Sequence, residues 1–318
     1  MTALSPFRLR PWFRTRIWGV RDLSPWYDYS VTGEPIGEVW LSGDDCLVDN
    51  GPLAGRRFAS VFSEHREALL GPGYAHDERF PLLMKVLFPK EKLSVQVHPG
   101  DAMAREAGEP HGKTECWYVL DAEPDASVAL GLQPGTTDEQ MRNAIENNGL
   151  EPLLHWIPVH KGEMVFVDAG TIHAIGPGAI LLETQQNSDM TYRLYDYGRP
   201  RELHLTDGLK ASRAVTRAGK TTPRREDGGE VLVQSEYFRV DRFSVAAGER
   251  HPFHAAVPGL DASGCVHLVF VARGSGSVQW DGGALEVSRG QLAVVPASVT
   301  EWSFLGNEAV ELLRACPI

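Results

Sequence analysis

Two segments of this chain repeat one pattern, and this repeat constrains the fold more than any other feature of the sequence. Residues 162–173, GEMVFVDAGTIH, align without a gap with residues 290–301, GQLAVVPASVTE. Each copy has a glycine turn, four apolar residues, a corner of small residues and a final polar position. Apolar runs this short, placed between turn residues, are typical of strands. The repeat therefore predicts two copies of one β-rich unit.

Similar runs recur along the chain and predict a mostly β protein. They include residues 82–88, 117–120, 179–182 and 267–271. The chain has 32 glycines and 21 prolines among its 318 residues, which is a turn-rich composition. A helical pattern is confined to a small insert at about residues 101–150. There, Thr137 and Gln140 have capping-box spacing, which predicts a helix that reaches about Asn147.

Residues 216–229 are the best linker candidate, because they contain almost no apolar side chains. A boundary there predicts a first domain at residues 1–220 and a second domain at residues 221–318. One copy of the repeat lies in each domain.

The charge of the chain limits its partners. The formal net charge is −11 at pH 7, from 31 Lys and Arg residues against 42 Asp and Glu residues. This charge disfavours nucleic acid and anionic lipid, although a few local cations are enough to bind a small anion. No apolar run approaches the roughly 18 residues of a membrane span, and the N-terminal segment lacks the apolar region of a secretory signal. We therefore expect no membrane partner.

The cysteines are few and scattered. Cys46, Cys116, Cys265 and Cys316 form no CxxC motif. This spacing disfavours a zinc–cysteine site and a disulfide framework, and it favours the reducing cytoplasm. We expect a cytoplasmic monomer or weak homo-oligomer.

Polar side chains gather on one face of a predicted strand at residues 93–99. Alternate residues of a strand point to the same side, so Ser94, Gln96 and His98 face one way. Such a row suits the interior of a barrel that holds a metal. Taken alone, it equally suits a half-exposed strand.

Two further positions join this row. Lys113 and Glu115 share a face of the next predicted strand, where a solvated ion pair is the simpler interpretation. His173 ends the first copy of the repeat, where a lone histidine is more often a core residue than a ligand. Together the set is far more specific, because Gln96, His98, Glu115 and His173 supply nitrogen and oxygen donors from three strands. Such donors suit zinc in a catalytic site, and the two histidines with Glu115 also suit iron.

Four longer strings add a family resemblance to these separate signals. KLSVQVHP, GKTECWYVL, AGTIHAI and LLETQQNSDMTYRLYDYGR resemble type I mannose-6-phosphate isomerase in its short bacterial form. The likeness runs from about residue 7 to about residue 210, with a weaker match in the C-terminal part. The repeat also resembles the second conserved motif of cupins, which implies two jelly-roll barrels. The first copy keeps the metal-binding histidine of that motif as His173, whereas the second copy has Glu301.

The resemblance implies a zinc-dependent isomerase that interconverts mannose 6-phosphate and fructose 6-phosphate, a small sugar phosphate, through a cis-enediol. It implies one Zn²⁺ per chain, held by Gln96, His98, Glu115 and His173. Arg193 falls on the active-site arginine of the family. The family's positions for substrate contact or proton transfer correspond to Lys85, Ser94, Lys113 and Glu183.

From the chemistry of these groups, Glu183 is the favoured proton carrier, with Lys113 and Arg193 as its electrostatic partners. Lys85 and Ser94 are then expected to bind substrate. Asp168 departs from the family pattern, because a proline usually stands in the turn before the histidine.

Two other functions use the same residues. An iron-dependent bicupin dioxygenase needs the same three strong ligands, but Gln96 and the nearby cations favour zinc and a sugar phosphate. A non-catalytic sugar-binding bicupin is disfavoured because the ligand set is complete. In the second domain, which is predicted to lack a metal site, His251, His254 and His267 are expected to have structural or surface roles.

Overall fold

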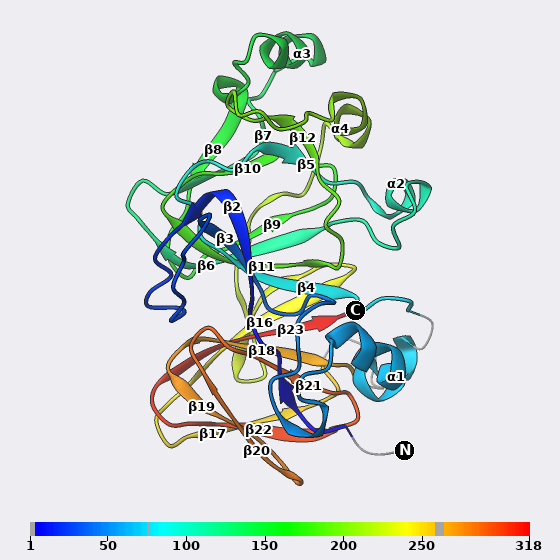
Figure 1. Ribbon diagram of the computed structural model, residues 1–318, viewed down its shortest axis with the longest axis vertical. Helices are drawn as coiled ribbons and strands as arrows, with labels where there is room; N and C mark the ends of the chain where they lie inside the picture. Colours follow the sequence, from blue (N-terminus) through cyan, green and yellow to red (C-terminus); the bar gives the residue numbers. More distant parts are fainter. Residues whose placement is uncertain (1–3, 75–76, 258–263) are drawn as a thin grey trace.

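The computed structural model describes residues 4–74, 77–257 and 264–318. Its strands form four antiparallel sheets, which stack as four layers along the longest axis of the molecule (Figure 1). The two upper layers come from the N-terminal half of the chain, and the two lower layers come mainly from the C-terminal half (Figure 1). This confirms the mostly β prediction, and a pair of sheets in each half is consistent with two jelly rolls.

The N-terminal half contains an outer five-stranded sheet and an inner seven-stranded sheet. The outer strands are β5 (Val95–Val97), β7 (Ser127–Leu132), β8 (Leu154–Pro158), β10 (His173–Ile175) and β12 (Tyr192–Tyr195). The inner strands are β2 (Trp12–Val20), β3 (Ile36–Trp40), β4 (Leu82–Leu87), β6 (Glu115–Ala122), β9 (Met164–Val167), β11 (Ala179–Gln186) and β13 (Gly219–Lys220). Their orders are β12-β5-β10-β7-β8 and β13-β9-β6-β11-β4-β3-β2.

The C-terminal half contains an inner seven-stranded sheet and an outer four-stranded sheet. The inner strands are β1 (Phe7–Arg8), β14 (Arg224–Glu226), β15 (Gly229–Gln234), β16 (Phe238–Val245), β18 (His267–Arg273), β21 (Leu292–Val295) and β23 (Val310–Pro317). The outer strands are β17 (Arg250–His254), β19 (Ser275–Trp280), β20 (Gly283–Ser288) and β22 (Glu301–Gly306). Their orders are β1-β21-β18-β23-β16-β15-β14 and β17-β22-β19-β20.

Strand alternation divides the apolar side chains between separate cores. In β6, Trp117 packs between the two sheets of the N-terminal half, whereas its neighbour Tyr118 packs toward the C-terminal half. The core between the halves joins residues such as Val86 and Leu182 to Leu268 on the facing sheet. The two halves therefore pack sheet against sheet.

The described residues include the α-helices α1 (Phe58–Leu70), α2 (Asp101–Glu106), α3 (Asp138–Glu146) and α4 (Leu205–Ala211). Short 3₁₀ helices span Gly51–Leu53, Pro72–Tyr74 and Glu151–Leu153. Helices α2 and α3 lie in the predicted insert at 101–150, and strands β6 and β7 separate them. Helix α1 is not among the predicted elements, because it loses helical geometry at His65 and its buried residues gather at its two ends. Among the described residues, no helix is long and apolar enough to cross a membrane.

The capping box predicted at the start of α3 is confirmed. The Gln140 backbone N–H donates to Thr137 Oγ1 at 3.2 Å, and the Thr137 N–H donates to Gln140 Oε1 at 2.9 Å. Both hydrogen bonds satisfy amide groups that the first turn of a helix leaves without a partner.

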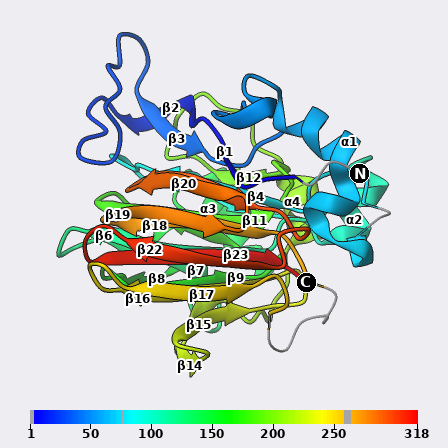
Figure 2. The same ribbon diagram turned by 90° about the horizontal axis from the view of Figure 1, so that it is seen from below.

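Two segments connect the halves. Strand β1 comes from the start of the chain but pairs with β21, where Phe7 lies opposite Val294. In the predicted linker at 216–229, β13 pairs with β9 of the N-terminal half and β14 pairs with β15 of the C-terminal half. Both views place α1 and the C-terminus at the same end of the sheets (Figures 1 and 2).

Candidate active site

The predicted donor residues meet between the two sheets of the N-terminal half. His98 follows β5, His173 opens β10, and Glu115 opens β6 on the facing sheet. Gln96 lies directly opposite His173 in the pairing of β5 with β10, and directly opposed residues share a face of a sheet. The two sheets therefore bring these side chains together from distant parts of the chain.

His98, Glu115 and His173 form a compact group. Glu115 lies between the imidazoles, with Oε2 at 3.5 Å from His98 Nε2 and Oε1 at 3.5 Å from His173 Nε2. One donor atom from each residue lies within 4.8 Å of the others. The described residues thus hold a buried metal-binding group of two imidazoles and one carboxylate.

Backbone carbonyls orient both imidazoles. His98 Nδ1 lies 2.9 Å from the Met190 carbonyl oxygen, and His173 Nδ1 lies 2.9 Å from the Thr171 carbonyl oxygen. Since a carbonyl only accepts, each Nδ1 carries the proton and each Nε2 presents a lone pair toward Glu115. Histidines that bind metals commonly have such a hydrogen bond on the second nitrogen.

His98, Glu115 and His173 are all buried, and this burial favours the neutral imidazole state that binds a cation. Each is only 1% exposed. Burial lowers the pKa of His98 well below its usual value and that of His173 to about 4, so both rings are neutral at neutral pH. Glu115 Oε2 is paired with the Lys113 ammonium at 2.8 Å, but Oε1 has no hydrogen-bond partner among the described residues. A buried carboxylate oxygen that lies beside two neutral imidazoles and lacks a partner fits a metal ion.

Gln96 and Ser94 border this group. Gln96 Nε2 lies 3.2 Å from His173 Nε2, and the Ser94 hydroxyl donates to Gln96 Oε1 at 3.3 Å. Offering Oε1 to a metal requires the Gln96 amide to turn over, which hardly alters its shape. Both residues lie where the sequence predicted them, on the face of β5 that carries His98.

Two buried lysines and Glu183 form a charged cluster beside the donors. Lys113 Nζ lies 2.8 Å from Glu115 Oε2 and 3.7 Å from Glu183 Oε1. Lys85 Nζ lies 3.2 Å from Glu183 Oε1 and 3.6 Å from Asp189 Oδ1. Lys85 and Glu183 face each other directly, because they are paired across β4 and β11.

The surroundings of this cluster change its proton affinities. Burial and the Glu115 charge raise the pKa of Glu183, although Lys113 and Lys85 act in the opposite direction. Burial alone would lower the pKa of Lys113, but Glu115 and Glu183 together raise it above its usual value. The cluster therefore combines a carboxylate of increased proton affinity with a cation that stays charged.

A cavity of about 390 Å³ opens beside the cluster. Its lining includes Lys85, Ser94, Gln96, Lys113, Glu183 and Arg193. The buried His98, Glu115 and His173 contact it through Gln96 and Lys113. The structure thus brings all nine predicted site residues to one place, as a buried group and the adjoining cavity wall.

Arg193 approaches the cavity from β12. Its backbone pairs with Gln96 on β5, and its Nη1 donates to the Glu202 carbonyl at 2.8 Å. Its Nε is buried and has no hydrogen-bond partner among the described residues. The guanidinium is therefore anchored at one nitrogen only.

The cavity lining includes four more charged residues, to which no sequence pattern gave a role: Arg16, Glu38, Asp189 and Arg201. Arg16 donates from Nε and Nη2 to both oxygens of Glu38, each at 2.9 Å. The sequence signal for this pair was its place within the family resemblance, which begins at about residue 7. With these residues, five cations face three carboxylates around the described cavity, a balance that suits an anionic ligand in an acidic protein.

Asp168, at the position where the family resemblance leads us to expect proline, is held by hydrogen bonds outside the donor group. Its carboxylate accepts the Thr171 hydroxyl at 3.0 Å and the Arg217 backbone N–H at 3.0 Å. It thereby ties the turn before His173 to the segment that leads to β13. Its carboxylate does not belong to the metal-binding group.

Comparisons with known proteins agree with this geometry. The family model described as phosphomannose isomerase type I, catalytic domain, matches residues 6–135. Mannose-6-phosphate isomerase ManA of Bacillus subtilis is 36% identical over 257 residues, which cover 76% of this chain and 80% of ManA. The mannose-6-phosphate isomerase of Streptococcus mutans is 33% identical over 316 residues, covering 95% of this chain and 96% of that protein.

The three-dimensional comparison gives the same result. A crystal structure of the mannose 6-phosphate isomerase from Bacillus subtilis matches this chain with a TM-score of 0.86 at 31% identity. The match covers 98% of this chain and 99% of that chain.

Proposed function

The chain belongs to the type I phosphomannose isomerase family, and from this premise we propose that it interconverts mannose 6-phosphate and fructose 6-phosphate. The observation that carries the proposal is the contact between a buried His–Glu–His group and a cavity with an excess of cations. The cavity volume of about 390 Å³ is in the range of small-molecule sites.

The reaction moves one proton between neighbouring carbons of the sugar. A base removes the proton from C2 of the aldose while O1 gains a proton, which gives a cis-enediol; the first proton then returns to C1 while the O2 hydroxyl loses its proton, which gives the ketose. The protein must therefore supply a proton carrier and must stabilise negative charge on the sugar oxygens.

The donor set fits a divalent cation, and we assign it one Zn²⁺ per chain, held by Gln96, His98, Glu115 and His173. Nitrogen and oxygen donors without thiolate are typical of catalytic zinc. When bound, such an ion supplies Lewis acidity and helps to orient the sugar hydroxyls.

Glu183 is the proposed proton carrier. It lines the cavity, and its raised pKa increases its ability to accept a proton from carbon. Lys85 and Lys113 both contact its Oε1, at 3.2 and 3.7 Å. These contacts fix its position between the cavity and the donor group.

Lys113 and Arg193 are the proposed electrostatic partners. Lys113 stays charged beside Glu183, so it can stabilise an enediolate oxygen as the proton moves. The fork of Arg193 suits either the enediolate or the phosphate. Lys85 and Ser94 would contact the substrate along the same wall.

We also propose that the enzyme acts in the cytoplasm as a monomer or weak homo-oligomer. All four cysteines are buried free thiols, a state that a reducing compartment preserves. The net charge of −11 supports a small anion held by local cations, rather than nucleic acid, as the partner.

The test is an isomerase assay on both sugar phosphates, with the purified chain before and after chelation. We expect activity in both directions, loss of activity with the chelator, and recovery with Zn²⁺. In deuterated water, the product should carry solvent deuterium, because a proton carrier exchanges with solvent.

Two results would replace the proposal. Oxygen uptake by the iron-loaded chain, without isomerisation by the zinc-loaded chain, would favour the dioxygenase. Sugar-phosphate binding without turnover under any metal would favour a binding protein.

A further inference from the structure

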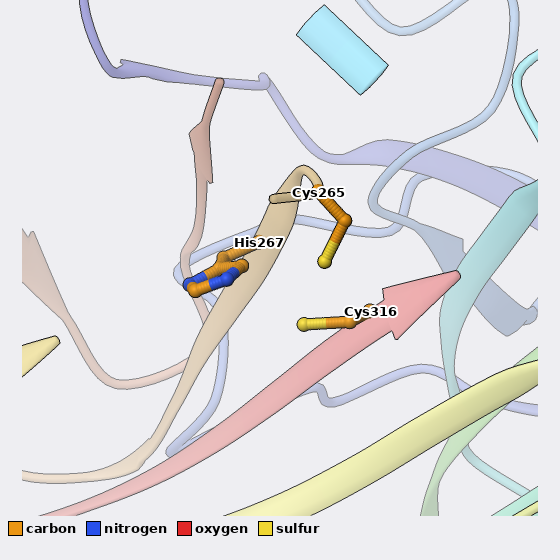
Figure 3. A group of neighbouring side chains, drawn as sticks. All are labelled: Cys265, His267 and Cys316. Carbon is orange, nitrogen blue, oxygen red and sulfur yellow. The ribbon is translucent and has the colours of Figure 1, made fainter. Parts of the chain in front are cut away.

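A second group of metal donors lies in the C-terminal half, far along the chain from the site described above. Cys265 precedes β18, His267 opens β18, and Cys316 lies near the end of β23 (Figure 3). All three side chains are buried, and they point toward one another (Figure 3). The proposed isomerase reaction uses none of them.

The fold itself brings these residues together. Cys265 and His267 are two positions apart, so they project from the same side of an extended chain. Strands β18 and β23 are neighbours, and Leu268 lies opposite Ala315. One residue further along each strand, His267 and Cys316 become cross-strand neighbours.

The donor atoms are close enough for one ion. One donor atom from each residue lies within 4.8 Å of the others. Zinc–sulfur bonds of about 2.3 Å and zinc–nitrogen bonds of about 2.0 Å place tetrahedral donors roughly 3.5–3.8 Å apart. Movements of about 1 Å by the side chains would therefore bring these three donors to zinc-binding distance, with the fourth tetrahedral position left for a further ligand such as water.

The hydrogen bonds of His267 match those of a metal ligand. His267 Nε2 donates to the Ala255 carbonyl at 3.3 Å, which leaves Nδ1 with the lone pair. Nδ1 is buried and has no nitrogen or oxygen partner among the described residues, and the His267 ring interacts with the Cys316 thiol. The Ala255 carbonyl also accepts the backbone N–H of Cys265 at 3.1 Å, so it holds two of the residues in place.

The strand pairing places His267 of this cysteine–histidine group at a position equivalent to that of Glu115 in the His–Glu–His group. Glu115 lies opposite Val167, and His267 lies opposite Val295, which is the residue that matches Val167 in the repeat. His267 therefore takes the register position of Glu115 in the second half. Glu301, which matches His173, is exposed and is not part of the group. The second half thus has a different donor set, with an imidazole at the position of Glu115 and two thiols beside it.

We propose that Cys265, His267 and Cys316 form a second metal site, which binds a thiophilic divalent cation of the Zn²⁺ class. Two thiolates, one neutral imidazole and a divalent cation have no net charge together, so burial of the bound set costs little. The ion would tie the end of β23 to the start of β18, which gives it a structural role.

Cobalt provides the test, because Co²⁺ bound to thiolate has a near-ultraviolet charge-transfer band, whereas Co²⁺ bound only to nitrogen and oxygen does not. The full chain would be stripped of metal, kept reduced and reloaded with Co²⁺. We expect two bound Co²⁺ per chain and one thiolate-type band. The band should vanish in Cys265→Ser and Cys316→Ser, each with one bound Co²⁺ remaining.

Two control variants separate this site from the rest of the chain. Cys46→Ser should keep the band, because Cys46 is a buried thiol elsewhere in the fold. His98→Ala, which impairs the catalytic donor group, should also keep it. The unmodified chain alone decides the question if a cysteine variant fails to fold.

Three results would overturn the proposal. The first is the absence of the band while all four thiols titrate as free. The second is a band that survives Cys265→Ser. The third is a Cys265–Cys316 disulfide in the native chain, detected by mass spectrometry without reduction.

Discussion

At the scale of single residues, two buried carboxylates of the site have the same chemical group but different neighbours. Glu115 and Glu183 are both buried carboxylates, yet Glu115 lies between two imidazoles beside one ammonium group, while Glu183 lies beside two ammonium groups. The first arrangement favours holding a metal, and the second favours moving a proton. This difference is why we give the two residues separate roles.

Replacing Glu183 tests the proposed proton carrier. Glu183→Gln keeps the shape of the side chain but cannot take a proton from carbon, so kcat should fall by about 10²- to 10⁴-fold. Exchange of the C2 hydrogen with deuterated water should be lost, while the zinc content stays unchanged. Glu123→Gln, at an exposed position, is the matched control. Undiminished exchange in the Glu183 variant would give the role to another base.

Arg193 allows a test of geometry at constant charge. Arg193→Lys keeps the positive charge but loses the planar fork, so we expect kcat/KM to fall by roughly 10- to 100-fold, the effect of one or two charge-assisted hydrogen bonds. Metal content should not change. Arg225→Lys, on the exposed strand β14, should behave like the unmodified enzyme. Equal rates for both variants would mean that only the charge of Arg193 matters.

Local rules indicated the members of the donor group at the residue scale, although each signal taken alone left a simpler interpretation open. Alternation in a strand places Gln96 and His98 on one face, and the repeat marks the position of His173. Arg16, Glu38 and Arg201 were not predicted as cavity residues. They lie on segments that come close to the cavity only because of the sheet order and the paths of the loops. No local pattern in a sequence contains that information.

At the scale of elements, the capping box of α3 shows how far local chemistry determines structure. Thr137→Ala removes the acceptor of one amide and should destabilise the helix by about 1 kcal/mol. Hydrogen exchange should become faster in the first turn of α3. Thr137→Ser keeps the hydroxyl and should restore protection. Unchanged exchange in the alanine variant would show that packing of Met141 and Ile145 alone maintains this turn.

Element positions were less predictable than element types. Short apolar runs identified strands, but β18 and β23 are neighbours only because of the sheet order. The spacing of Cys265 and Cys316 in the sequence therefore argued against a cysteine site, whereas the fold brings the two residues together. Helix α1 was missed for a related reason, since its two apolar ends are separated by a kink at His65.

At the scale of the whole molecule, the two halves are joined by a broad apolar core with a polar contact near it. Tyr118 of β6 donates its hydroxyl to Glu311 of β23 at 2.8 Å, and Arg242 of β16 donates to the same hydroxyl at 3.3 Å. A single tyrosine thus connects one half of the molecule to two strands of the other. The repeat predicted two similar halves, but not that they would pack sheet against sheet.

This contact predicts how stability changes at alkaline pH. Burial raises the pKa of Tyr118 from 10 to about 12, so the folded state keeps a proton that the unfolded chain loses. The stabilisation is fully present below pH 10 and is lost as the pH rises toward 12. It amounts to about 3 kcal/mol at most, because the pKa rises from 10 to about 12. The unmodified chain should therefore lose more stability between these pH values than Tyr118→Phe, which has no such proton.

Thermal unfolding across this range measures the difference, with Tyr29→Phe at an exposed tyrosine as control. If Tyr118→Phe lost stability in parallel with the unmodified chain, the hydroxyl between the halves would not be the group that titrates.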